Sequence, residues 1–205
     1  MLCTTAMDLR AVAHWAAKHL DSLTHEHRVY RIAATLFDLT RDLHGLDASA
    51  RHLLRAAAIV HDVGRSIDKA DHPAIGARLI LRDRSLPVGE GERRKLAFLT
   101  RYHRDGVPSL EEDGILRDWD DPESMRLILA LLRVADALDS RSKESPRLVF
   151  GLKKKRLKIT CYFEELTAKT KRIYQRRKKF RLFEEELGCA IEVDVRKGEA
   201  LKLVA

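Results

Sequence analysis

The chain has 205 residues and a formal net charge of +8, and this length can bury a full core as one domain or as one domain with a small appendage. Its three cysteines are isolated and form no Cys-x-x-Cys pair, which argues against a zinc ribbon and against a secreted disulfide framework. The longest apolar stretch, residues 128–132, is far too short to cross a membrane, and Asp8 and Arg10 stand where a signal peptide needs apolar residues, so we expect a cytoplasmic protein.

Apolar residues at helical spacing predict successive helices in the first two-thirds of the chain. The predicted helices cover residues 7–20, 24–44 and 48–61, then a short helix from 72, a helix over 90–103 and a last one from 122. Thr24 and Asp47 are the expected N-caps of the second and third helices, and Gly45 is the expected stop of the second. Pro73 and Pro122 suit the first turn of the helices that they open. Residues 105–120 are acidic, contain glycine and proline, and are expected to form a loop.

After residue 145 the pattern changes to the alternation that is typical of strands. Apolar residues alternate over 148–152 and over 157–163, on either side of a lysine-rich turn, which predicts a hairpin. A long amphipathic helix over 166–187, a stop at Gly188 and a short strand over 191–195 complete the chain. We therefore expect a mainly α protein, with a helical domain in residues 1–145 and a small basic α+β subdomain in residues 146–205.

Several polar side chains fall on the apolar faces of the predicted helices. His25, His61 and His103 share stripes with apolar residues, and Asp136 lies on a helix that is apolar nearly all round. A buried carboxylate needs a cation or a strong donor beside it. A single inward histidine is more often a hydrogen-bonded core residue, and Asp136 could simply pair with Arg133. Together, these groups indicate a polar site inside the helical domain.

The positive charge is concentrated in two runs near the C-terminal end, residues 153–156 and 176–179. Such runs suit polyanions such as nucleic acid or polyphosphate, and they are equally typical of a solvated turn and a solvated helix face. Aromatic residues are few and not interleaved with the basic ones, so a base-stacking platform for single-stranded nucleic acid is not indicated.

Four stretches of the sequence resemble a known family. They are residues 57–64 (AAIVHDVG), 101–104 (RYHR), 131–139 (LLRVADALD) and 183–193 (FEEELGCAIEV), and they are similar to the C-terminal HD region of the exopolyphosphatase/guanosine pentaphosphate phosphohydrolase (Ppx/GppA) family. The resemblance implies an HD-domain helical bundle. Family members carry two actin-like domains ahead of this region, where hydrolysis is thought to occur. A chain of this length has no room for these two domains, so we do not expect the activity of the actin-like domains in this protein.

The resemblance to the wider HD superfamily also implies a set of metal ligands: His25, His61, Asp62 and Asp136. It further implies that His72 and His103 serve as ligands of a second metal ion or contact phosphate. Arg104 stands where the cyclic-dinucleotide-cleaving HD branch has a histidine. Imidazole and carboxylate suit a divalent ion such as Mn²⁺, Fe²⁺, Zn²⁺, Ni²⁺ or Mg²⁺, and we expect one ion or two.

The function expected from this site is metal-dependent hydrolysis of a phosphate ester or anhydride in a nucleotide, an alarmone or polyphosphate. Asp62 is the expected catalytic residue, as a ligand or as a bridge between two ions. Arg65, Arg104 and Arg133 are candidates for binding the phosphate, and each is also open to interpretation as a surface or structural arginine. The alternative is a non-catalytic HD module that binds a polyanion through the basic C-terminal region or partners a separately encoded actin-like phosphatase. We expect no membrane partner, and a homodimer is compatible with the sequence.

Overall fold

The computed structural model describes residues 7–106, 114–115, 121–141 and 145–198. The first part of the chain forms helices α1 (Leu9–Ala16), α2 (Thr24–Leu39), α3 (Arg41–His44), α4 (Ala48–Val60), α5 (His72–Arg82), α6 (Glu90–Tyr102) and α7 (Pro122–Ala137). The second part forms strands β1 (Arg147–Lys153) and β2 (Arg156–Phe163), helix α8 (Ala168–Tyr174), the 3-10 turn η1 (Arg177–Lys179), helix α9 (Arg181–Leu187) and strand β3 (Ala190–Lys197). The prediction of a mainly α fold with a small α+β part is confirmed. The division at residue 145 stays a prediction, and most of the predicted loop over 105–120 lies outside the described residues.

Local capping explains where several helices begin and end. The Asp47 side chain accepts a hydrogen bond of 2.9 Å from the Ala50 backbone N–H at the start of α4, which satisfies one of the unpaired donors of a helix N-terminus. Gly45 has a φ of 63° after α3, the left-handed conformation that glycine adopts without strain. The predicted helix over 24–44 is interrupted at Thr40, whose hydroxyl donates to the Leu36 carbonyl oxygen at 2.7 Å.

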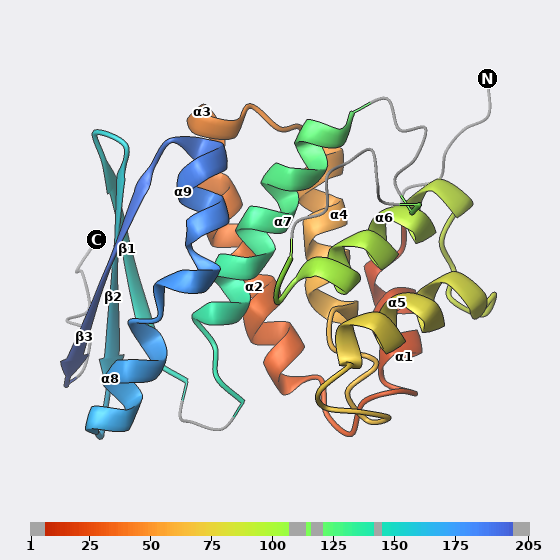
Figure 1. The fold of residues 1–205 in the computed structure, drawn as a ribbon, viewed down its shortest axis with the longest axis horizontal. Helices are drawn as coiled ribbons and strands as arrows, with labels where there is room; N and C mark the ends of the chain where they lie inside the picture. The colour runs from red at the N-terminus through yellow and green to blue at the C-terminus, as the bar shows by residue number, and fades with distance from the viewer. Residues whose placement is uncertain (1–6, 107–113, 116–120, 142–144, 199–205) are drawn as a thin grey trace.

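Helices α4 and α7 form the centre of the bundle (Figure 1). Helix α7 packs against α2, α4, α6 and α9, and helix α4 also contacts α1. The side chains of α4 in this region are small, with Ala56, Ala57 and Ala58 fully buried, so that neighbouring helices approach closely. Because α4, α6 and α7 converge, the polar residues at their C-terminal ends meet at one place.

Two glycines allow the turn after α4 to pack directly on α5. A Cβ added to Gly64 would lie 2.3 Å from the backbone oxygen of His72 and 2.5 Å from the backbone nitrogen of Gly76. A Cβ on Gly76 would lie 2.9 Å from the Thr100 side chain. No larger residue fits at Gly64 without a backbone shift, so this glycine fixes the position of the turn relative to α5.

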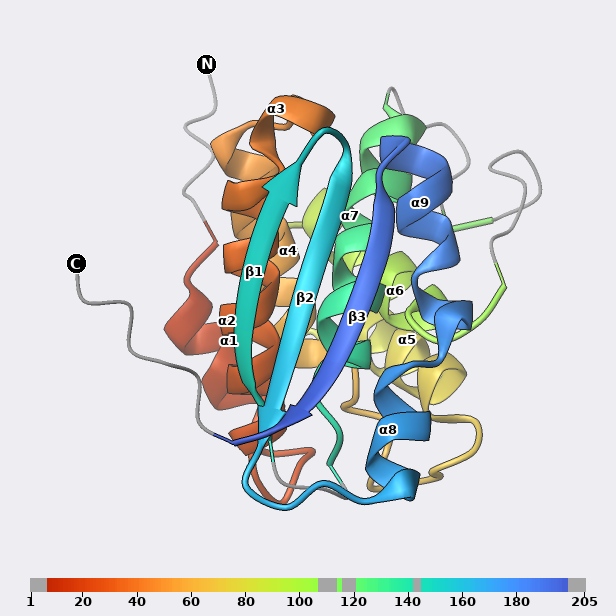
Figure 2. The ribbon, with the colours of Figure 1, turned by 90° about the vertical axis from the view of Figure 1, so that its left-hand side faces the viewer.

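The C-terminal sheet has the order β1-β2-β3, with β1 and β2 antiparallel and β2 and β3 parallel (Figure 2). The predicted hairpin is confirmed. Its two-residue turn consists of Lys154 and Lys155, with φ values of 48° and 56°, as a tight turn matched to the strand twist requires. The residues that point toward the helices are buried, among them Leu157, Ile159 and Cys161. The sheet lies at one end of the molecule, next to α9, and α5 and α6 lie at the other (Figure 1).

The predicted long helix over 166–187 is wrong, because the chain forms α8, η1 and α9 instead. Tyr174 and Phe183 are both fully buried, yet in one uninterrupted helix they would point about 180° apart. The break near Arg176, whose backbone is extended, turns the second half so that both aromatic rings reach the core. It also brings the 3-10 turn η1 next to α7.

Among the described residues, no helix is both long and apolar enough to cross a membrane.

Candidate metal centre

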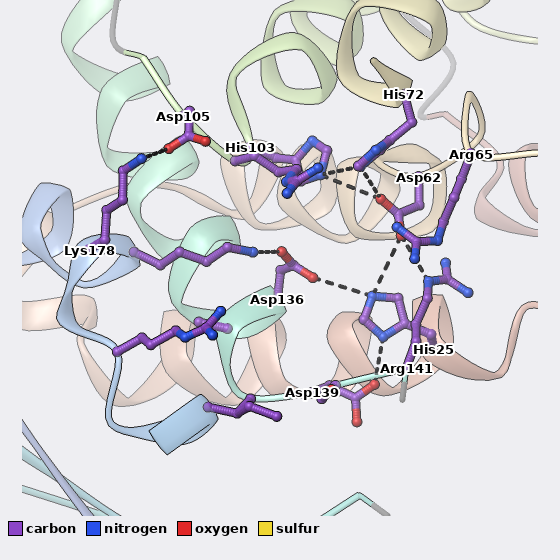
Figure 3. Close-up of a pocket in the computed structure, with 16 residues that line it drawn as sticks. His25, Asp62, Arg65, His72, His103, Asp105, Asp136, Asp139, Arg141 and Lys178 are labelled. Atoms are coloured by element: carbon purple, nitrogen blue, oxygen red, sulfur yellow. Dashed lines mark hydrogen bonds and ion pairs between the residues drawn. The ribbon is translucent and has the colours of Figure 1, made fainter. Parts of the chain in front are cut away.

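Side chains from five helical elements meet beside the C-terminal ends of α4, α6 and α7 (Figure 3). His61 and His103 are the residues that directly follow α4 and α6, and Asp62 is in the turn after α4. The others lie near the beginning of α2, at the beginning of α5 and in the last turn of α7: His25, His72 and Asp136. The structure therefore brings together all six residues predicted as metal ligands or second-site residues.

One half of the centre surrounds Asp136. Its Oδ1 atom lies 3.3 Å from His25 Nε2 and 3.7 Å from His61 Nε2. All three side chains are largely buried, and that of His61 is fully so. Two imidazole nitrogens and one carboxylate oxygen thus face a common point.

The other half surrounds Asp62. Its Oδ1 atom lies 2.9 Å from His72 Nε2 and 3.4 Å from His103 Nε2, and these two nitrogens are 3.2 Å apart. Its Oδ2 atom lies 4.0 Å from His25 Nε2, which links the two halves. Asp62 is therefore in contact with both groups of histidines.

In each of the four histidines, the contact made by Nδ1 determines that Nε2 faces the centre. In His61, His72 and His103, Nδ1 lies 2.7–3.0 Å from the backbone oxygen of the residue three positions earlier. In His25, Nδ1 lies 2.6 Å from an oxygen of Asp139. A carbonyl or carboxylate oxygen can only accept, so Nδ1 carries a proton and Nε2 is the nitrogen that faces the centre and can bind a metal ion. This arrangement of outer acceptors is typical of metal-ligating histidines.

The donor set fits a divalent cation. In the described part of the chain, three overlapping groups of donor atoms each lie within 4.8 Å of one another: His25, His61 and Asp62; His61, His103 and Asp136; Asp62, His72 and His103. His61 Nε2 is buried and has no hydrogen-bond partner within the described structure. An unpaired buried polar atom is costly, and an ion at this point would remove the cost. The mixture of imidazole and carboxylate suits first-row divalent metals.

Burial and charge shift the pKa values of these groups strongly. Burial alone would raise the pKa of Asp62 and Asp136, but the surrounding histidines hold the pKa of Asp62 well below its usual range, and Lys179 and the histidines do the same for Asp136. Burial lowers the pKa of His61, yet Asp62 and Asp136 outweigh it and raise the pKa to about 9. In His103 burial dominates, and the pKa falls to about 4. The two carboxylates are therefore charged at neutral pH and available as ligands.

A cavity of about 390 Å³ opens above the centre. His25, Asp62, His72, His103 and Asp136 line it, whereas His61 lies beneath them. Among its described lining residues are six cationic side chains: Arg65, Arg104, Arg141, Arg176, Lys178 and Lys179. A cavity with this lining can bind an anion directly beside the metal ligands.

Two of the three predicted phosphate-binding arginines line this cavity, Arg65 and Arg104. Arg133 does not. Its Nε donates to the Tyr102 carbonyl oxygen at 2.8 Å, and its guanidinium also contacts the Gly106 carbonyl oxygen. Arg133 therefore holds the end of α6, and Asp136 pairs with Lys179 and not with this arginine.

Four residues of the centre were not predicted from the sequence: Glu26, Asp139, Arg141 and Lys179. Asp139 orients His25 and lies just past the end of α7, three residues after Asp136. That spacing could have revealed it. Lys179 belongs to the second basic run and contacts Asp136. Glu26 and Arg141 contact each other although they are 115 positions apart in the sequence. No local pattern indicates such a pair.

Residues 9–186 match the family described as Ppx/GppA phosphatase, domain III. A comparison with curated proteins found no match. The family match spans the helices that carry the candidate metal centre and continues into α9, in agreement with the resemblance in the sequence. Because it covers well over half of the residues, the chain belongs to the Ppx/GppA phosphatase family, of which it carries domain III.

Proposed function

We propose that the chain is a metal-dependent phosphohydrolase that cleaves a phosphate ester or anhydride in a small phosphorylated molecule or in polyphosphate. The observation that carries this proposal is the position of the cationic cavity, which lies directly over the cluster of histidines and aspartates. Phosphoryl transfer needs cations around the phosphate and a Lewis acid beside it. The family of the chain supports the same class of reaction.

In this proposal His25, His61, Asp62 and Asp136 hold one divalent ion, and His72 and His103 hold a second ion or contact the phosphate. A bound divalent ion supplies Lewis acidity toward the phosphoryl oxygen and lowers the pKa of a water molecule. These donors are compatible with Mn²⁺, Fe²⁺, Zn²⁺, Ni²⁺ and Mg²⁺. The imidazole ligands favour the transition metals among them.

The other residues of the chain prepare the reaction. Asp62 contacts both groups of histidines, so it is the residue that aligns the ligands, and its loss disrupts both. Arg65 and Arg104 line the cavity and present guanidinium donors to the phosphate oxygens. Asp139 keeps His25 in the tautomer that offers Nε2 to the centre.

Elemental analysis combined with a phosphatase assay tests the proposal. The purified protein should contain a divalent transition metal and should hydrolyse small phosphate esters or nucleotides with added Mn²⁺. Asp62→Ala should lose both the metal and the turnover. A charge reversal of Lys153, Lys154 and Arg156, which lie at the hairpin away from the cavity, is the matched control and should keep both. Metal-free wild-type protein, or bound metal with no turnover of any phosphate compound, would contradict the proposal.

The second candidate function is that of a non-catalytic module that binds a polyanion or a separately encoded actin-like phosphatase. It is favoured by a groove at the hairpin lined by Lys153, Lys154, Arg156 and Lys158. If this groove is the main site, polyphosphate binding should weaken steeply with salt, because each neutralised phosphate releases a counterion. The hairpin charge reversal should then abolish binding while the metal content stays unchanged. We favour the cavity, because the second basic run supplies Lys178 and Lys179 to its lining.

We further propose that the protein is cytoplasmic. Cys161 and Cys189 are free and buried, and unpaired thiols are the usual state in a reducing compartment. Expression of a tagged full-length protein followed by fractionation would test this location.

A further inference from the structure

The two aspartates of the centre share a pattern in their contacts. In each, Oδ1 faces the histidines, and Oδ2 faces a cation from the chain after α7 (Figure 3). Asp136 Oδ2 contacts Lys179 Nζ, and Asp62 Oδ2 lies 2.9 Å from Arg141 Nε. Thus both proposed metal ligands are paired with a positive charge from the same chain.

Both cations also face the cavity. Lys179 and Arg141 are among its lining residues, and their side chains are 29% and 26% exposed, whereas those of Asp136 and Asp62 are 11% and 6% exposed. An ammonium group has three N–H donors and a guanidinium has five. Each cation can therefore contact its carboxylate and an anion in the cavity.

We infer that Lys179 and Arg141 act as counterions of the metal-ligand carboxylates in the metal-free protein and as phosphate-binding residues once the metal is bound. This inference rests on the proposed function, since it assigns roles to the residues of that same site. A divalent ion on the histidine side competes with Lys179 for the charge of Asp136 and weakens their ion pair. The freed ammonium then interacts with the phosphate in the cavity that it lines.

The two residues differ in what else they hold. Arg141 also contacts Glu26, which is fully buried, so removing the arginine would leave a buried charge unpaired and endanger the fold. Lys179 forms its ion pair with Asp136 from a long, flexible stem in η1, next to an exposed Lys178 that pairs with Asp105 at 2.5 Å. Lys179 is therefore the residue to test, and Lys178 is the matched control for the metal affinity alone.

The inference predicts opposite changes in two affinities. Lys179→Met removes the competing charge, so the metal-free protein should bind Mn²⁺ roughly tenfold more tightly, the size expected of one partly buried charge pair. The same variant, loaded with Mn²⁺, should bind inorganic phosphate roughly tenfold more weakly. Lys179→Arg retains the charge and should restore both affinities toward the wild-type values. Lys178→Met contacts no ligand carboxylate and should leave the Mn²⁺ affinity within about twofold.

Isothermal titration of Mn²⁺ and of inorganic phosphate into the full chain measures both affinities, and thermal melting verifies that each variant is folded. If Lys179 only supports the fold, Lys179→Met should weaken the binding of Mn²⁺ and of phosphate together, and Lys179→Arg should not restore either affinity. This outcome overturns the inference. Unchanged Mn²⁺ or phosphate affinity in Lys179→Met also overturns it, while leaving the proposed function intact. If wild-type protein binds no Mn²⁺, the proposed function fails and the inference fails with it.

Discussion

Protonation of His61 makes the stability of the metal-free protein depend on pH in a defined direction. Burial lowers the pKa of this imidazole, but the carboxylates of Asp62 and Asp136 outweigh burial and raise it from 6.5 to about 9. The protonated imidazole of His61 therefore contributes its full stabilisation of the fold below pH 6.5, and this contribution is lost as the pH rises through about 9. The difference between the two pKa values corresponds to about 3 kcal/mol. About 2 kcal/mol of this is lost between pH 6.5 and 8.5.

Urea unfolding of the EDTA-treated protein at several pH values between 6.5 and 8.5 measures this loss. In the wild type, the free energy of unfolding should fall by about 2 kcal/mol over this interval. His61→Asn is the matched control, because asparagine is polar but does not titrate, and its curve should be flatter. His25, whose pKa is also raised, remains in both proteins, so the pH dependence of the variant is reduced and not abolished. Equal slopes in the two proteins would refute the reasoning.

Three further predictions concern the residues that surround the candidate metal centre and the ion that it binds. Asp139→Asn weakens the acceptor of the His25 Nδ1 proton, so the Mn²⁺ affinity measured by calorimetry should fall roughly 10- to 100-fold; an unchanged affinity would contradict this role. Gly64→Ala places a Cβ 2.3 Å from a backbone oxygen at the start of α5 and should cost roughly 1–3 kcal/mol in urea unfolding. Gly91→Ala is the control, because there is open space around its new Cβ, and it should be neutral or up to about 1 kcal/mol more stable. An equal loss of stability in the two variants would contradict the close packing at Gly64. Saturating Mn²⁺, at about 100 times its Kd, should stabilise the wild type by about 2.7 kcal/mol, and the same stabilisation of Asp62→Ala would show that the ion binds elsewhere.

Features set by local chemistry were predictable from the sequence. The start of α4 follows from the Asp47 cap, and the end of α3 follows from the left-handed Gly45. The stripes of apolar residues identified His25 and His61 as inward groups, and both are buried in the centre. Periodicity shows which face of a helix a side chain occupies, and in a protein with one core this places the polar exceptions near one another.

The features that the sequence did not reveal depend on contacts between distant segments. Lys179 and Asp136 are 43 positions apart, and Arg141 and Glu26 are 115 apart, so no local pattern joins them. The break between α8 and α9 has the same origin. Residues 166–187 have the composition of one amphipathic helix, but packing requires Tyr174 and Phe183 on the same side of the chain. Tertiary packing overrides helix propensity here, and it thereby carries η1 to the cavity.

The central claim is that the cluster of histidines and aspartates holds a divalent metal ion. Anomalous diffraction at the manganese edge, from crystals grown with Mn²⁺, tests it most directly. The account predicts a strong anomalous peak enclosed by His25, His61, Asp62 and Asp136, and no peak at this position in crystals of Asp62→Ala. Crystals of the wild type with no peak inside the cluster, or with manganese bound only elsewhere on the protein, would contradict it.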